Sequence, residues 1–141
     1  DMAKLTGPGW SWEVISGKAE SEGTAAEGPV ASLTGLFTSR LKLEAGAVFS
    51  GHVPEGRTLL LYVVTGAVRL GDVELKPFTT PVFDRSGGTL DLTAEADTTL
   101  LWCHGDPIEE PVVSYGPFVM NTEEEIRTAY AEYQRGDFGH V

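Results

Sequence analysis

The sequence has one cysteine, Cys103, in 141 residues. A single thiol excludes a disulfide within the chain and is typical of a protein from a reducing compartment. The sequence also lacks an apolar run near the roughly 18 residues that a membrane-spanning helix needs. Its N-terminus lacks the basic and apolar segments of a signal peptide. We therefore expect a cytoplasmic protein without a membrane segment.

Basic residues are scarce as well. Ten Lys and Arg stand against 21 Asp and Glu, so the formal net charge is −11. A surface of this sign repels nucleic-acid phosphates and anionic lipid head groups. The composition therefore disfavours direct binding to nucleic acid or to membranes, and its simplest meaning is solubility.

The common catalytic patterns are missing too. The sequence has no G-x-S-x-G element, and its early Gly-Pro-Gly lacks the helix and the lysine of a phosphate loop. The three histidines, His52, His104 and His140, share no spacing typical of metal ligands. Cys103 and His104 are adjacent on a predicted strand, where neighbouring side chains point to opposite faces. They are poorly placed for a thiolate–imidazole pair, and we expect Cys103 to be a small core residue.

The sequence does contain a series of short β-type segments. These are residues 36–44, 58–64, 89–93 and 98–103. Residues 58–64 (TLLLYVV) are continuously apolar, which predicts a strand buried on both faces. Residues 70–73 (LGDV) give a hairpin signal. Short strands at regular spacing, separated by turn signals, predict an all-β sandwich or barrel.

The N-terminal third divides into a linker, a short strand and a loop. Residues 1–9 end in a cluster of Gly and Pro and are predicted to be a linker. Trp10, Trp12 and Val14 alternate in a way that predicts a strand. The two tryptophans could stack on a planar ligand or pack into a core or interface, and packing is the simpler interpretation. Residues 20–29 are predicted to form an exposed loop.

The C-terminal residues 122–141 predict a helix followed by a tail. Thr122 and Glu125 form a capping box, and three glutamates in the first turn suit the positive end of the helix dipole. Ile126, Ala129, Tyr130 and Tyr133 recur at helical spacing, so one face of the helix is predicted to be buried. Gly136 follows as a C-terminal cap.

Residues 107–126 (PIEEPVVSYGPFVMNTEEEI) resemble the C-terminal signature of the pirin family, whose members carry two cupin barrels in one chain. The strand spacing before this segment is similar to that of the second barrel. The resemblance implies an all-β, cupin-type double-stranded β-helix (a jelly-roll barrel) with one C-terminal α-helix. It implies a metal-free barrel over residues 10–121, with residues 122–141 packing on that barrel or on a partner domain.

Metal-binding cupins place a glycine, five residues and His-x-His, with a glutamate and a second glycine at fixed offsets. Gly46, His52 and Gly66 fit this pattern. Pro54 stands where the second histidine belongs, and Leu59 where the glutamate belongs. Three imidazoles and a carboxylate have to converge to hold the ion, so this first motif is incomplete.

The second cupin motif supplies one more histidine after a glycine and a proline. Gly71 and Pro77 match it, but Thr79 replaces a glycine and Val82 replaces the histidine. One potential ligand of four remains. We therefore predict no catalytic, cofactor-binding or metal-binding residues and no cofactor in this chain. The resemblance implies iron or another divalent metal in the first barrel of the parent protein.

Three functions are compatible with these patterns. The first is a non-catalytic partner barrel that packs on the metal-bearing barrel through the segment around Phe118 and Met120, or self-associates when that barrel is absent. The resemblance associates bacterial parents with quercetin-type dioxygenase activity and animal parents with redox-sensitive transcriptional coregulation.

The second is a stand-alone, metal-free module that binds a small apolar ligand, with Tyr62, Trp102 and His52 as candidate lining residues. The third is an isomerase or lyase that needs no metal. It would require an acid–base pair inside the barrel, and most acidic residues fall at turns or in the helix. Arg57 could hold an anion, although a surface ion pair is the default interpretation. Enzymatic activity of this chain alone is not expected.

Overall fold

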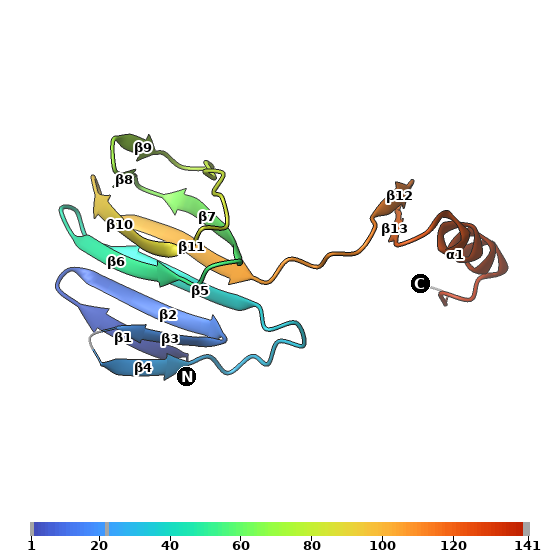
Figure 1. Ribbon diagram of the computed structural model, residues 1–141, viewed down its shortest axis with the longest axis horizontal. Coiled ribbons are helices and arrows are strands. Elements are labelled where there is room, and N and C mark those ends of the chain that lie inside the picture. The colour runs from blue at the N-terminus through green and yellow to red at the C-terminus, as the bar shows by residue number, and fades with distance from the viewer. Residues whose placement is uncertain (1, 22, 140–141) are drawn as a thin grey trace. The chain divides into compact units, whose positions relative to one another are not determined.

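A computed structural model describes residues 2–21 and 23–139 of the chain. The chain forms two compact units, one ending at Pro107 and the other beginning at Ile108. The first unit contains two antiparallel sheets and a small hairpin, and the second contains a hairpin and a helix (Figure 1). No helix among the described residues is long and apolar enough to cross a membrane.

Five strands form the larger sheet of the first unit. In spatial order they are β1 (Ala3–Gly7), β2 (Trp10–Ser16), β5 (Phe37–Leu43), β11 (Thr98–Gly105) and β7 (Thr58–Thr65). Every neighbouring pair is antiparallel. Side chains alternate between the two faces, as the two-residue period of a strand requires. In β5, for example, Phe37, Ser39, Leu41 and Leu43 are buried.

Four strands form the smaller sheet, in the order β6 (Val48–Val53), β10 (Gly88–Ala94), β8 (Val68–Leu70) and β9 (Val73–Leu75). β8 and β9 pair with Leu70 opposite Val73, which confirms the predicted hairpin. A separate hairpin joins β3 (Lys18–Ser21) and β4 (Thr24–Glu27). The predicted all-β fold with one C-terminal helix is thus confirmed.

Aromatic side chains connect the inner faces of the two sheets. Phe49 of β6 packs edge-on against Trp12 of β2 and Trp102 of β11, with ring centroids 5.1 and 5.9 Å apart. Trp12 and Trp102 are 4% and 0% exposed. Edge-to-face contacts of this kind add to the free energy gained from burial alone. Core packing, rather than a platform for a planar ligand, is therefore the role of Trp12.

A buried serine of the larger sheet forms hydrogen bonds to the two neighbouring strands. Ser39 is fully buried, accepts a hydrogen bond of 2.8 Å from Trp12 Nε1 and donates one of 2.7 Å to the Trp102 carbonyl. Without these contacts, the Trp12 N–H and the Ser39 hydroxyl would be buried without a hydrogen-bond partner. The serine therefore ties β2, β5 and β11 together at the centre of the core.

The predicted linker over residues 1–9 is wrong. Ala3–Gly7 is an edge strand that pairs with β2, and Leu5, opposite Trp12, is 3% exposed. The Gly and Pro residues form the turn between the two strands, with Gly9 at φ 70. The composition of the turn was mistaken for that of the whole segment. Leu5, buried opposite Trp12, helps to hold this segment in the sheet.

Two other predictions need correction. Residues 20–29, predicted to be a loop, contain most of the β3–β4 hairpin. β7, predicted to be buried on both faces, alternates between buried and more exposed positions, and Leu60 is 45% exposed. β7 forms one edge of an antiparallel sheet, and such sheets often pack one face on the core and leave the other face in contact with water.

The C-terminal unit consists of β12 (Val113–Tyr115), β13 (Phe118–Met120) and α1 (Glu123–Arg135). The hairpin was predicted to belong to the barrel, over residues 10–121, but it groups with the helix instead. Its turn brings Gly116, at φ 58, close to the helix. A side chain there would overlap the Tyr130 hydroxyl.

The predicted capping box of α1 is confirmed. The Thr122 hydroxyl accepts from the Glu125 N–H at 3.2 Å, and the Glu125 carboxylate accepts from the Thr122 N–H at 2.8 Å. Ile126 and Ala129 are buried, whereas Tyr133, predicted to be on the buried face, is 64% exposed. Tyr133 still contacts Phe118 of the hairpin, with ring centroids 6.3 Å apart, but most of its side chain remains exposed.

Candidate functional site

β6, an edge strand of the smaller sheet, determines which side chains reach the interior of the barrel here. In β6, Phe49, Gly51 and Val53 are buried, while Ser50 and His52 between them are exposed. A side chain at Gly51 would lie 2.6 Å from Trp102 Cη2, so the glycine makes room for the indole. The inward positions at the end of β6 therefore carry no heteroatom that could bind a ligand.

The cupin template chosen from the sequence is displaced by one residue at this strand. It gave His52 and Pro54 the ligand positions, but the strand turns Gly51 and Val53 inward. A shift of one residue reverses the face of every side chain. Leu59 does face inward, at 9% exposed, whereas Val82, at the template's last ligand position, is 99% exposed.

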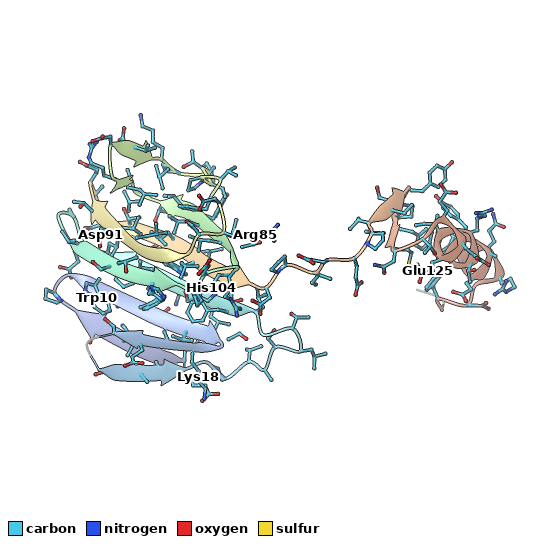
Figure 2. All side chains as sticks on the ribbon, viewed as in Figure 1. Trp10, Lys18, Arg85, Asp91, His104 and Glu125 are labelled. Carbon is cyan, nitrogen blue, oxygen red and sulfur yellow. The ribbon has the colours of Figure 1, made fainter. Side chains whose placement is uncertain are left out.

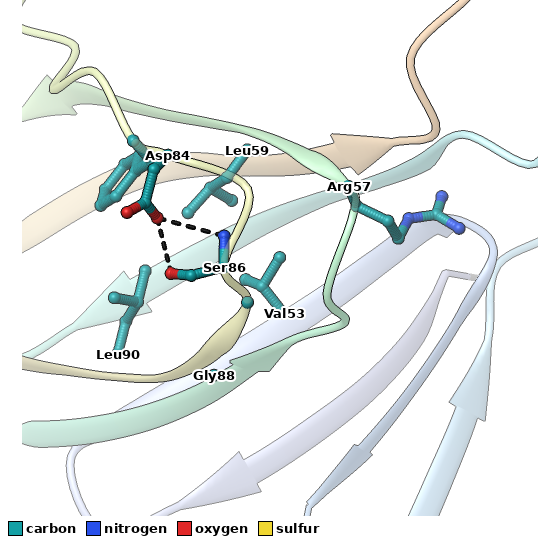
Figure 3. A pocket seen from close by; sticks show the side chains of 9 residues that line it. Val53, Arg57, Leu59, Asp84, Ser86, Gly88 and Leu90 are labelled. Atoms are coloured by element: carbon teal, nitrogen blue, oxygen red, sulfur yellow. Dashed lines mark hydrogen bonds between the residues drawn. The ribbon is translucent and has the colours of Figure 1, made fainter.

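A cavity of about 80 Å³ lies at this end of the barrel (Figure 3). Its apolar lining comes from four different segments: Val53, Leu59, Phe83 and Leu90. Val53 and Leu59 are buried, and Phe83 and Leu90 are half-buried. The cavity thus has a hydrocarbon floor, which includes Leu59 at the position that the cupin pattern gives to a glutamate.

Polar groups lie at the mouth of the cavity. Asp84 Oδ1 accepts hydrogen bonds from the Ser86 hydroxyl at 2.6 Å and from the Ser86 N–H at 3.1 Å (Figure 3). These two bonds lower the pKa of the exposed Asp84 carboxyl below its ordinary value, since they favour the charged form. The carboxylate is therefore ionised at neutral pH.

Arg57 contributes to the lining through its stem, but its guanidinium points away from the cavity (Figure 3). The guanidinium forms an ion pair of 3.3 Å with Asp106 and donates to the His104 carbonyl at 3.2 Å. The ion pair, rather than the alternative anion site, is thus what its contacts show. Arg57 joins the start of β7 to the end of β11.

His104 lies near the end of β11 (Figure 2). Its ring stacks on Phe37, with centroids 4.6 Å apart and planes 16° apart. Burial, with the Arg57 charge as the next cause, lowers the pKa of His104 to about 4. The imidazole is therefore neutral at pH 7, and its Nδ1 is buried with no hydrogen-bond partner among the described residues.

The remaining residues named from the sequence do not converge on this site. His52 faces outward, Tyr62 is half-buried, and Trp102 belongs to the core rather than to the cavity lining. Cys103, expected in the core, is half-buried because the strand turns Trp102 inward beside it. His140 lies outside the described residues.

Sequence reasoning missed Val53, Phe83, Asp84 and Leu90. One local signal was available: Asp84 begins the run Asp-Arg-Ser-Gly-Gly, a turn sequence in which an aspartate bonds to the backbone two residues on. No pattern in the sequence, however, places that turn against Val53 and Leu59. Their proximity depends on the packing of the two sheets.

A divalent cation does not fit this cavity. Transition metals require imidazole, thiolate or carboxylate donors that converge from several strands, and the floor here offers only hydrocarbon. Among residues 2–21 and 23–139, no three His, Cys, Asp or Glu side chains are grouped closely enough to hold a metal ion. Asp84 alone supplies one carboxylate.

Comparison with known proteins identifies the family. Residues 38–139 match the model of the pirin C-terminal cupin domain. A pirin-like protein of Caulobacter vibrioides is 38% identical over 128 residues, which cover 89% of this chain and 45% of that protein. Mouse pirin is 31% identical over 144 residues, or 99% of this chain and 48% of that protein.

The fold agrees with this match. The crystal structure of quercetin 2,3-dioxygenase from Acinetobacter baumannii superimposes with a TM-score of 0.85 at 38% identity, covering 97% of this chain and 46% of that chain. This chain thus spans less than half the length of each of these three relatives. It belongs to the pirin family and has the cupin fold of that family's C-terminal domain.

Proposed function

We propose that this chain is a non-catalytic cupin barrel that supports a separate, metal-bearing barrel of a pirin-type protein. The observation that carries the proposal is the cavity floor. Val53 and Leu59 present hydrocarbon to the cavity, and Leu59 holds the position that the cupin pattern gives to a glutamate. Such a barrel keeps the scaffold of a cupin without the side chains of its chemistry.

The proposed activity of the whole protein follows from its relatives. One of them is named quercetin 2,3-dioxygenase, and this chain covers 46% of its length. We place the flavonol oxidation in a companion barrel that carries iron or another divalent metal. The role of the present barrel is then to stabilise that companion and to shape the opening of its site.

Metal analysis tests this proposal. The purified chain is incubated in turn with iron(II), nickel(II), copper(II) and zinc(II), desalted, and analysed for bound metal and for quercetin turnover. We expect metal far below one ion per chain and no turnover. A stoichiometric ion that supports quercetin cleavage would overturn the proposal. The full two-barrel relative, treated in parallel, is the positive control.

A second candidate function is a ligand-binding module, and the cavity of about 80 Å³ favours it. Apolar cavities with a few polar groups at the mouth are typical of small-molecule sites. A ligand that binds only the folded chain raises its melting temperature. Thermal-shift screening with small apolar compounds therefore tests this candidate, and no shift with any compound would count against it.

A further inference from the structure

The cavity at the end of the barrel combines a hydrocarbon floor with a single charge at its mouth. Val53 and Leu59 are only 4% and 9% exposed, so the floor is shielded from water. Asp84 also lines the cavity but is exposed to solvent. An occupant would therefore need an apolar part inside and a part outside that complements a carboxylate.

The Asp84 carboxylate is held in one orientation. Both hydrogen bonds from Ser86 go to Oδ1, at 2.6 and 3.1 Å. Within the described part of the chain, Oδ2 takes part in no hydrogen bond or ion pair. One carboxylate oxygen is therefore fixed, ionised and available to an incoming donor, and charge-assisted hydrogen bonds are the stronger kind.

No described cation of the protein neutralises Asp84. The neighbouring Arg57 turns its guanidinium away from the cavity and pairs with Asp106 (Figure 3). Arg85, the next residue along the loop, forms no ion pair with Asp84 among the described residues. The net charge of −11 adds a general attraction for cations. The mouth therefore favours a positively charged group over a neutral or negative one.

The volume limits the apolar part of the occupant. A cavity needs about 10–15 Å³ to hold one water, and an engineered apolar cavity of about 150 Å³ takes benzene. At about 80 Å³, this cavity lies between the two. It suits a short aliphatic chain rather than a flavonol, whose three rings are much larger than benzene.

We propose that this cavity binds a small aliphatic amine, with the alkyl chain among Val53, Leu59 and Leu90 and the ammonium group against Asp84 Oδ2. This inference rests on the second candidate function, that the barrel takes a ligand here. The ammonium stays at the wet mouth, so its hydration is only partly lost. The alkyl chain displaces water from the hydrocarbon floor, and this burial of apolar surface favours binding.

The test is an NMR titration of the full chain with three probes at constant salt. The probes are n-butylammonium, 1-butanol, which has the same chain without the charge, and ammonium chloride, which has the charge without the chain. The methyl signals of Val53, Leu59 and Leu90 report binding. We expect n-butylammonium to bind more tightly than 1-butanol by about three- to fivefold, the scale of an exposed ion pair, and ammonium not to move the methyl signals.

Asp84→Asn is the diagnostic variant. The amide oxygen can still accept from Ser86, but the charge is gone, so n-butylammonium should bind about as weakly as 1-butanol. Asp91→Asn is the matched control, because Asp91 also accepts a serine hydroxyl at 2.6 Å, from Ser50, but does not line the cavity. It makes the same change in net charge and should leave the preference intact.

Val53→Ile tests the location. The added methyl group occupies part of the cavity, so binding of both butyl probes should weaken together. Equal affinity of the two butyl probes for the unmodified chain would overturn the amine assignment while leaving the ligand-binding function standing. Methyl signals that no probe moves would overturn both. Undiminished binding in a folded Val53→Ile chain would show that the amine lies elsewhere and would also overturn the assignment.

Discussion

Ser39 is one of the few polar residues within the barrel core, and its hydroxyl has a partner on each side. It receives the Trp12 N–H and donates to the Trp102 carbonyl. A buried polar group that loses its partner keeps the full cost of desolvation. The pair of tryptophans and the serine therefore depend on one another, although only the tryptophans are visible as core residues in the sequence.

We predict that Ser39→Ala lowers the free energy of unfolding by about 1–3 kcal/mol, because the Trp12 N–H is left buried without an acceptor. Urea denaturation followed by tryptophan fluorescence measures this change. Ser50→Ala is the matched control: Ser50 is exposed and bonds to Asp91, and its loss should change the free energy by less than about 0.5 kcal/mol. Equal effects of the two substitutions would contradict the prediction.

His104 makes the stability of the barrel depend on pH. Its pKa is about 4 in the folded chain, compared with about 6.5 for an ordinary histidine. Burial is the first cause, the Arg57 and His52 charges act in the same direction, and Asp106 opposes them. Between these two pH values the unfolded chain binds a proton that the folded chain does not. Stability therefore falls as the pH falls from about 6.5 to 4, and is unaffected by His104 above this range.

We predict that His104→Phe removes this part of the pH dependence, because phenylalanine can keep the stack on Phe37 but cannot titrate. The urea midpoints of both proteins, measured from pH 7.5 to 4, test it. The difference between them should change across pH 6.5 to 4 in favour of the variant. A constant difference over the whole range would show that His104 does not bind its proton at a lowered pKa.

At the scale of single elements, α1 begins where a local signal places it. Thr122 and Glu125 exchange two hydrogen bonds, and both residues are exposed, so no tertiary contact is needed to explain the cap. The β strands behave differently. β1 and the β3–β4 hairpin have sequences typical of loops. β1 nevertheless pairs with β2, and β3 pairs with β4, so strand pairing overrides that composition.

We predict that Thr122→Ala weakens the start of α1 by about 0.5–2 kcal/mol, the usual cost of losing a capping hydroxyl. Amide hydrogen exchange of the first helical turn should speed up accordingly. Thr128→Ala, in the exposed middle of the same helix, is the control, because alanine has the higher helix propensity there. Unchanged exchange in the first turn of the Thr122 variant would contradict the prediction.

At the scale of the whole molecule, the C-terminal unit is too small to bury a core of its own. A two-stranded hairpin is at best marginally stable, and domains below about 40 residues usually need disulfides, metals or a partner. Val119 is 65% exposed and Tyr115 is 68% exposed, while Phe118 packs on Tyr130 with ring centroids 5.0 Å apart. Around Phe118 and Met120, the exposed apolar side chains are thus those of Val119 and Tyr115.

We predict that the chain self-associates at high concentration and that Val119→Lys weakens this association, because it puts a charge in the exposed apolar surface. Sedimentation velocity over a hundredfold range of concentration measures it. Thr128→Lys adds the same charge on the helix and should have little effect. A chain that stays monomeric over the whole range would refute the prediction, as would equal weakening by the two substitutions.

The capping box and the β8–β9 hairpin could both be predicted because each depends on residues close together in the chain. Leu59, at the position that the cupin pattern gives to a glutamate, is buried, whereas His52 lies on the exposed face of β6. The inward face of β6 is set by the packing of Phe49 and Gly51 against Trp102. Nothing local shows which of two alternating faces turns inward.

The local sequence therefore determined the periodicity of the strands, the turns with glycine, and the helix with its cap. Which residues surround the cavity depended on how two sheets pack, because Val53, Leu59, Asp84 and Leu90 come from separate segments. Contacts between segments far apart in the chain depend on tertiary packing, and the local patterns of one sequence do not predict them. The same holds for Arg57, whose turn away from the cavity depends on carbonyls and a carboxylate far along the chain.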